Sequence, residues 1–233
     1  MNLNASKRTE MVKHRPVKTT GTGAARRSAL QQYRMRAHQY DLELQPFEPL
    51  RQEAIARLRL QPGEVVVDVG CGTGLSFAPL MEKLGPTGRV VGIEQCPEMM
   101  TRASERIDRS DWKTQVSLIQ ASAQEAQWRG RADAAIFHFT HDVLRSPAAI
   151  GNVLAHLRPG ARVVATGLQW AAPWAGPVNL FVMGAALYSV TSLDGLAQPW
   201  SELAKRLQDF EHQPTWMGCV YIATGTWPGP AST

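Results

Sequence analysis

The stretch Val65–Gly74, which reads Val-Val-Val-Asp-Val-Gly-Cys-Gly-Thr-Gly, constrains the fold of this 233-residue chain more than any other. Its first half is apolar and β-branched except for Asp68, which predicts a buried parallel strand over residues 65–69. Three glycines follow at alternate positions, and a helical pattern begins at Leu75. Glycine lacks a Cβ, so a ligand can approach its backbone closely. This order of strand, glycine turn and helix predicts an α/β domain that binds a ligand at the helix N-terminus.

The glycine spacing and Asp68 indicate the charge of that ligand. A dinucleotide fingerprint reads G-x-G-x-x-G, whereas here Gly74 comes one residue early and Leu75 stands where the fingerprint has glycine. A carboxylate at Asp68 would repel a pyrophosphate and attract a cation. S-adenosylmethionine carries a sulfonium and an ammonium group, so the pattern favours it over NAD. An NAD-dependent oxidoreductase is therefore the weakest of the alternatives.

Residues 65–74 closely resemble motif I of the class I S-adenosylmethionine-dependent methyltransferases. From about Tyr33 to Gly225 the chain is most similar to their small-molecule branch, which includes the ubiquinone and menaquinone C-methyltransferases. The resemblance implies an α/β, Rossmann-like fold: a seven-stranded, mostly parallel sheet with helices on both faces and one antiparallel C-terminal strand. It also implies S-adenosyl-L-methionine as cofactor. The expected reaction is in-line transfer of the methyl group to oxygen, nitrogen or carbon of a small, largely apolar or aromatic acceptor.

Charge and composition divide the chain into three parts. Residues 1–28 are basic and lack apolar periodicity, which predicts a disordered tail. Residues 29–60 resemble the N-terminal helical lid of the small-molecule methyltransferases, and 61–233 are predicted to form the methyltransferase domain. Residues 1–36 hold nine Lys or Arg and one acid, a net charge of +8, which leaves −3 on the remainder. A domain that is not itself basic argues against a nucleic-acid partner, although the tail is able to contact RNA or an anionic membrane.

The predicted cofactor site collects residues from the ends of several strands. Glu94 ends the strand predicted at 89–93, where the resemblance places the acid that binds the ribose hydroxyls. After the strand predicted at 115–119, relatives often carry Gly-Asp-Ala, whose Asp binds the adenine amino group. Here Ser122 offers only a hydroxyl at that place, with Glu125 as a substitute carboxylate. The full predicted set is Asp68, Gly70, Cys71, Gly72, Gly74, Glu94, Gln95, Ser122, Ala123 and His138.

Two histidines and an aspartate lie where the strand predicted at 133–139 ends. Open α/β sheets bind ligands beyond the carboxyl ends of their strands, and the resemblance places this strand beside the first, so this end is expected to face the methyl group. Histidine can accept a proton at neutral pH. His141 is the predicted general base, with His138 as the second candidate. Asp142 either orients His141 or caps the next segment, and a purely structural histidine is the alternative.

The acceptor is expected to contact the lid and the region after the fifth strand, predicted at 161–167. The predicted contacts are Tyr33, Tyr40, His141, Trp170 and Trp174. Residues 168–200 carry five aromatic side chains and no charge until Asp194. Such a lining suits a hydrophobic acceptor, but the composition is also typical of a dimer interface or a membrane-surface contact. A homodimer and a peripheral membrane contact therefore stay open.

The remaining features narrow the cell compartment and the alternatives. Cys71, Cys96 and Cys219 are widely spaced, which favours a reducing, cytoplasmic location and argues against a disulfide framework or a zinc site. We expect no metal cofactor. Pro173 and Pro177 break the longest uncharged run, which argues against a transmembrane helix. Two other functions stay open: RNA or protein methylation guided by the basic tail, and a non-catalytic adenosylmethionine-binding scaffold.

Overall fold

The computed structural model of the chain describes residues 40–189 and 193–230. The predicted tail and the first part of the predicted lid therefore lie outside the described residues. The strands are β1 (Val65–Val69), β2 (Arg89–Glu94), β3 (Val116–Gln120), β4 (Ala132–His138), β5 (Leu157–Leu168), β6 (Gln208–Thr215) and β7 (Val220–Trp227). The helices are α2 (Tyr40–Glu43), α3 (Glu48–Arg57), α4 (Phe77–Leu84), α5 (Pro97–Asp108), α6 (His141–Leu144), α7 (Pro147–Ala155), α8 (Gly176–Ser189) and α9 (Ser201–Ala204), with short 3₁₀ turns η1 (Gln45–Phe47) and η2 (Trp216–Gly218).

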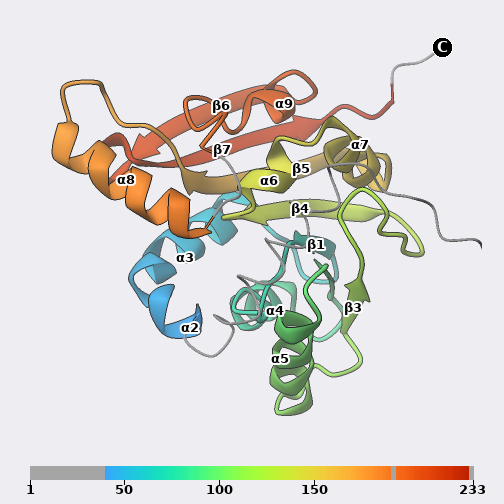
Figure 1. Ribbon diagram of the computed structural model, residues 1–233. Coiled ribbons are helices and arrows are strands. Elements are labelled where there is room, and N and C mark those ends of the chain that lie inside the picture. Colours follow the sequence, from blue (N-terminus) through green and yellow to red (C-terminus); the bar gives the residue numbers. More distant parts are fainter. Residues whose placement is uncertain (1–39, 190–192, 231–233) are drawn as a thin grey trace, which may run out of the picture.

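The strands form one seven-stranded sheet in the order β3-β2-β1-β4-β5-β7-β6 (Figure 1). The first five strands in this order pair in parallel, and β7 is antiparallel to both β5 and β6. This topology confirms the predicted fold, including the antiparallel strand beside the fifth. The chain runs from β1 outward to β3 and then returns to β4 on the other side of β1. Ligands of open α/β sheets bind at such a reversal, so the topology singles out the carboxyl ends of β1 and β4.

Helices cover both faces of the sheet because each helix has an apolar side to bury. In α5, Met99, Ala103 and Ile107 follow one another four residues apart and are all buried. Pro97 is the first residue of that helix, where a missing backbone N–H costs nothing. Buried side chains of α3, α4, α5 and α8 form one apolar cluster with the sheet, and those of α6, α7 and α9 belong to the other.

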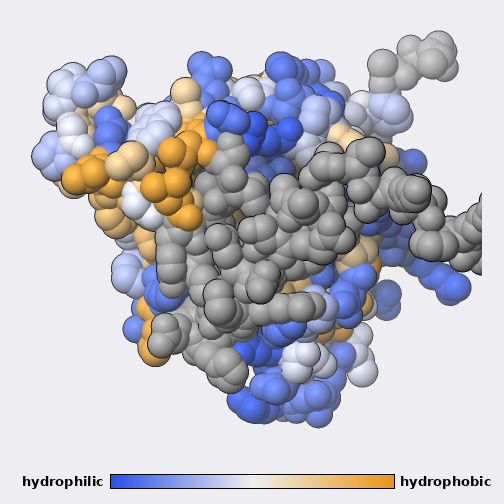
Figure 2. Space-filling model, in the orientation of Figure 1, coloured by the Kyte–Doolittle hydropathy of each residue, from blue (hydrophilic) through white to orange (hydrophobic). Residues whose placement is uncertain are grey.

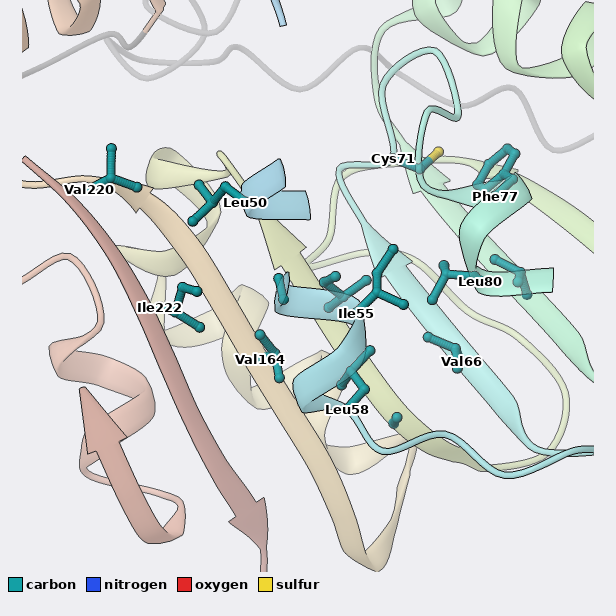
Figure 3. Packing of buried hydrophobic residues seen from close by; sticks show 14 of the residues in the cluster. Leu50, Ile55, Leu58, Val66, Cys71, Phe77, Leu80, Val164, Val220 and Ile222 are labelled. Atoms are coloured by element: carbon teal, nitrogen blue, oxygen red, sulfur yellow. The ribbon is translucent and has the colours of Figure 1, made fainter. Parts of the chain in front are cut away.

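Helix α3 packs across the strands next to the topological reversal (Figure 3). Leu50, Ile55 and Leu58 are at most 2% exposed and lie against strand residues such as Val66 and Val164. Burial of each such side chain contributes about 1.5–3 kcal/mol. This packing fixes α3 over the sheet and determines where its few polar residues point.

The side-chain pattern over residues 200–208 predicts one helix, and this prediction is wrong. Helix α9 ends at Ala204, and β6 begins at Gln208. The backbone of β6 pairs with β7, with Gln208 opposite Thr226 and Thr215 opposite Val220. The backbone N–H and C=O groups of β6 form hydrogen bonds with those of β7, and this pairing outweighs the helical pattern of the side chains. The other predicted strands and helices lie within a few residues of their observed bounds.

Substitution of Ile136 by Ala tests the central core. Ile136 lies on β4, in the middle of the sheet, and is fully buried. We expect Ile136→Ala to lower the free energy of unfolding by about 2–4 kcal/mol, because it removes buried methyl groups and leaves a cavity. Urea denaturation measures the change. Ser117→Ala, at an exposed position of β3, is the control and should change stability by less than about 0.5 kcal/mol. Equal effects of the two substitutions would contradict this account of the core.

Candidate functional site

Two cavities meet at the carboxyl ends of β1 and β4, and both are lined by Gly70. The larger one lies between the glycine turn, the end of β2 and residues 139–143, and its volume is about 690 Å³ including the part open to solvent. The smaller one lies between the glycine turn, Leu44 and Arg51 of the N-terminal segment, and His138. The predicted site therefore exists as two adjacent spaces that share Gly70 and have different linings.

Gly70 lies where the two cavities meet, and its lack of a side chain lets it pack against Thr140. Its φ is +69°, and an added Cβ would lie 2.5 Å from Cγ2 of Thr140. Its backbone N–H donates to the carbonyl of Ile93 at 2.8 Å, which ties the end of β1 to β2. Any larger residue would both strain the backbone and close the gap toward Thr140.

Glu94 places a partly buried carboxylate in the larger cavity. Its Oε2 accepts the backbone N–H of Gly72 at 3.1 Å, and its Oε1 accepts that of Cys96 at 2.8 Å. Burial raises the pKa of Glu94, while these backbone hydrogen bonds act in the opposite direction. Each carboxylate oxygen keeps a further lone pair, so Glu94 can still accept two hydroxyl protons from a ligand.

The smaller cavity holds two opposite charges that are almost completely buried. Asp68 is 1% exposed, and its Oδ2 has no hydrogen-bond partner among the described residues. Arg51 is 3% exposed; its Nε donates to Glu48 and its Nη1 to Ser76, while its Nη2 is unpartnered within the described ranges. Burial raises the pKa of Asp68 to about 7, although the charge of Arg51 lowers it. A ligand with both an ammonium and a carboxylate would satisfy both side chains.

His138 lines the smaller cavity, on the same side as Asp68. Its Nδ1 lies 2.5 Å from Oγ1 of Thr166, and its Nε2 finds no partner in the described part of the chain. Burial, together with the charge of Arg51, lowers the pKa of His138 well below its usual value, so the ring is neutral at pH 7. The histidine that sequence reasoning ranked second thus lies in a different cavity from the one ranked first.

His141 lines the larger cavity in an orientation that suits a general base. Its Nε2 lies 3.0 Å from the backbone carbonyl oxygen of Asp194. A carbonyl only accepts, so Nε2 carries the hydrogen and Nδ1 keeps the lone pair. This buried Nδ1 has no hydrogen-bond partner among the residues described. Burial lowers the pKa of His141, while the Asp194 carbonyl and the charge of Asp142 act to raise it.

A hydrogen-bonded cluster attaches α2 to the glycine turn. The hydroxyl of Thr73 donates to Oδ1 of Asp41 at 2.5 Å, and Nη2 of Arg106 donates to Oδ2 of Asp41 at 2.8 Å. The Nε of Arg106 also donates to the carbonyl of Thr73 at 3.0 Å. These bonds connect α2, the glycine turn and α5, and thereby position the segment that brings Leu44 and Arg51 to the smaller cavity.

The structure brings most of the predicted cofactor residues together, but not all. Gly70, Gly72, Glu94, Gln95 and Ala123 line the larger cavity, and Asp68, Cys71 and His138 line the smaller one. Gly74 lines neither cavity. Its φ is +80°, and an added Cβ would lie 2.5 Å from the ring of Phe77. Ser122 also lines neither, and its hydroxyl donates to Glu125 at 2.6 Å.

Fewer of the predicted acceptor contacts than of the predicted cofactor residues lie at the two cavities. Tyr33 lies outside the described residues, and so does the side chain of Tyr40 at the start of α2. Trp170 packs against the apolar core, and Trp174 is 88% exposed. Neither tryptophan lines one of the two cavities. Of the predicted acceptor contacts, His141 alone lines a cavity of the described structure.

Sequence reasoning missed Arg51 and Phe139. Arg51 lies three and four residues before Ala54 and Ile55, so a charge falls on the apolar side of α3, and this spacing was a usable signal. Phe139 directly follows β4, has a φ of +56° and lines the larger cavity. A left-handed, non-glycine residue is uncommon and often marks a functional site, but no sequence pattern predicts it here.

Comparison with known proteins identifies the kind of domain that carries these cavities. Residues 66–160 match the model of a family described as a methyltransferase domain. A protein-L-isoaspartate O-methyltransferase from Triticum aestivum is 35% identical over 106 residues, which cover 45% of this chain and 46% of that protein. A 23S rRNA (uracil(1939)-C(5))-methyltransferase from Acinetobacter baumannii is 40% identical over 75 residues, 32% of this chain and 15% of that protein. The chain thus spans less than half the length of these relatives.

Solved structures share the fold over most of the chain. The N-methyltransferase NodS from Bradyrhizobium japonicum WM9, in complex with S-adenosyl-L-homocysteine, has a TM-score of 0.61 at 18% identity and covers 86% of this chain and 98% of that one. A putative methyltransferase in complex with the Trm112 activator of Haloferax volcanii has a TM-score of 0.63 at 13% identity, covering 88% and 100%. These likenesses show a shared fold, and residues 66–160, from β1 to the start of β5, are the part that matches the methyltransferase family model.

Substitution of Asp68 by Asn tests the buried charge through stability. The pKa of Asp68 is raised from 3.8 in the unfolded chain to about 7 in the fold, so the folded protein holds this proton more tightly. Its stability therefore falls as pH rises from about 4 to about 7. We expect Asp68→Asn to raise the melting temperature of the ligand-free protein by several degrees at pH 8 and to change it little at pH 4. Calorimetric melts at both pH values measure this, and a variant less stable at pH 8 would contradict it.

Proposed function

We propose that this protein is an S-adenosylmethionine-dependent methyltransferase that acts on a small, largely apolar or aromatic acceptor. The observation that carries the proposal is the pair of adjacent cavities that share Gly70, one with a partly buried carboxylate among apolar residues and the other with a buried arginine and aspartate. The methyltransferase domain at residues 66–160 contains that junction.

The two cavities complement the two ends of the cofactor. In the smaller one, Asp68 would bind the ammonium of the methionyl part, and Nη2 of Arg51 its carboxylate. In the larger one, Glu94 would accept the ribose hydroxyls, and Met99, Ala121 and Ala123 offer an apolar wall for the adenine. The sulfonium would then lie near Gly70, which lines both cavities. Asp68, Arg51 and Thr140 all have buried atoms without partners in the described residues, which a bound ligand can satisfy.

The chain's own residues mainly align the reactants. The bound cofactor supplies an activated methyl group with a good leaving group, so the protein needs to position the acceptor and exclude water. His141 lines the larger cavity, and its unprotonated Nδ1 would accept the proton of a phenol or of an enolizable carbon bound there. The carbonyl of Asp194 holds the ring in that tautomer.

Aromatic packing beside the cavity supports an apolar acceptor. The ring of Phe139, which lines the larger cavity, lies 4.9 Å from that of Phe47 in an edge-to-face contact. The ring of Phe47 in turn stacks on Trp216 at 5.0 Å. Protein and rRNA methyltransferases are among the relatives, but the family match ends at residue 160, before the aromatic segment. Methylation of RNA or protein is therefore the alternative that an acceptor screen must include.

Calorimetric titration with S-adenosylmethionine and S-adenosylhomocysteine tests the cofactor site. We expect both ligands to bind, and Asp68→Asn and Glu94→Gln each to weaken binding by about tenfold to a hundredfold, because each removes a charged acceptor from a buried contact. Glu82→Gln, on the exposed side of α4, is the matched control and should bind as the parent does. Equal binding by all three variants would refute the site, and binding of NAD instead would refute the cofactor.

Turnover by a His141→Gln variant tests the base. With phenols, quinones and lipids as trial acceptors, we expect turnover to fall by about 10²–10⁴-fold, while affinity for S-adenosylhomocysteine changes little. The parent's turnover should rise with pH up to the pKa of His141, which burial lowers below 6.5, and then stay level. The variant should lack this rise. Unchanged turnover in His141→Gln would assign the proton transfer to another group.

A further inference from the structure

Helix α8, the loop before it and η2 carry most of the large apolar side chains that the described structure leaves exposed. Its fourteen residues contain no charged side chain, and neither does the whole stretch from 163 to 193. The α8 face, as we call it, consists of Trp174, Leu180, Phe181, Met183, Leu187, Trp216 and Met217, of which Trp174 and Met217 are 88% and 81% exposed. Figure 2 shows apolar residues gathered over α8. None of the described helices is long and apolar enough to cross a membrane.

The η2 part of this face is continuous with the α8 part. The side chain of Asn179, on α8, hydrogen-bonds to the backbone of Ala171 and Ala172. A Cβ added to Gly218, which ends η2, would lie 3.7 Å from Cα of Ala171. The loop after β5 therefore holds α8 and η2 together at one surface.

Helix α8 is apolar on both sides, which is unusual for a helix at a protein surface. Its inner side packs Val182 and Ala186, both fully buried, against the core. Its outer side presents Leu180 and Leu187, which are 65% and 59% exposed. A helix that is hydrophobic all round is normally surrounded by an apolar environment. The outer side thus requires a partner that the folded chain described here does not supply.

The charge of the chain indicates what that partner is. Residues 1–36 carry a net charge of +8, and the described chain begins just after them, at α2. In Figure 1, α2 and α8 both lie to the left of the sheet. Stable attachment to a bilayer surface generally takes two signals, an apolar insertion and a basic segment attracted to anionic lipid. A second copy of the chain would instead bring two strongly basic segments together.

We infer that the α8 face docks on an anionic lipid bilayer. Trp174, Phe181 and the leucines enter the boundary between headgroups and acyl chains, and the basic segment adds electrostatic attraction. The helix lies in the plane of the membrane surface and does not cross it. Docking is independent of the catalytic proposal.

If the proposed function holds, the docked face also explains how an apolar acceptor reaches the site. A series of aromatic rings in contact connects the face to the larger cavity, in the order Trp216, Phe47 and Phe139. An acceptor dissolved in the bilayer could follow this apolar series without entering water. This consequence rests on the proposed function, whereas the docking does not.

Vesicle co-sedimentation of the full chain tests the docking. We expect the protein to sediment with vesicles that contain phosphatidylcholine and phosphatidylglycerol at about 3:1, which gives them roughly the surface charge of a cell membrane. We expect Leu180→Gln combined with Leu187→Gln to weaken this binding about tenfold or more, because both side chains lose their apolar insertion. The matched pair Leu180→Met and Leu187→Met keeps the apolar surface and should bind as the parent does. Melting temperatures check that all variants fold.

The contribution of charge has its own matched pair. Arg26→Gln with Arg27→Gln should weaken binding, and more strongly at low salt, because exposed charges are screened by ions. Arg109→Gln with Lys113→Gln removes the same charge near the C-terminal end of α5 and should have little effect.

Three results would overturn the inference. The first is that the parent does not sediment with the anionic vesicles. The second is that the parent and the glutamine variant of α8 bind the vesicles equally. The third is that light scattering shows a dimer for the parent and a monomer for the glutamine variant. The last would assign the α8 face to a second copy of the chain. Titration with S-adenosylhomocysteine, carried out separately, shows whether the cofactor site fails as well.

Discussion

The close approach of the glycine turn to the end of β4 is the constraint on which the site depends. Gly70 packs directly against Thr140, and it lines both the cavity that holds Glu94 and the cavity that holds Asp68 and Arg51. The pairing of β1 with β4 in the sheet brings the two segments together, since Val69 and Phe137 are opposite each other. A ligand with different chemistry at its two ends can therefore lie across one backbone position.

The site keeps charged groups out of water before any ligand arrives. Desolvation raises the pKa of both Asp68 and Glu94, and Arg51, which lines the same cavity as Asp68, is almost fully buried. Burial of charge is costly unless a partner compensates it, so a zwitterionic ligand is stabilised by groups that are already oriented. The same arrangement makes the empty protein less stable than its apolar core alone would allow. Affinity for the ligand and stability of the free protein are thus opposed at Asp68.

Polar and apolar recognition are separated in space. The ends of β1 and β2 present carboxylates, and the segment after β4 presents His141. On the other side of Phe139, aromatic rings lead to a helix without charges. Phe139 adopts a left-handed conformation at the boundary, which turns the chain from β4 toward α6. The molecule therefore has one end suited to a charged cofactor and another suited to an apolar surface.

The sequence by itself determined the sheet, the glycine turn and the cofactor carboxylates. Strand-forming runs and the turn at Gly70 are local signals, and the positions of Asp68 and Glu94 at strand ends follow from them. Local pattern also favoured a helix over 200–208, and there pairing with β7 decided otherwise. Only the tertiary structure brought Arg51 to Asp68, separated His138 from His141, and left Trp174 away from the cavities. These relations join residues far apart in the chain, and they depend on how α3 and the loop after β5 pack, which no short-range pattern encodes.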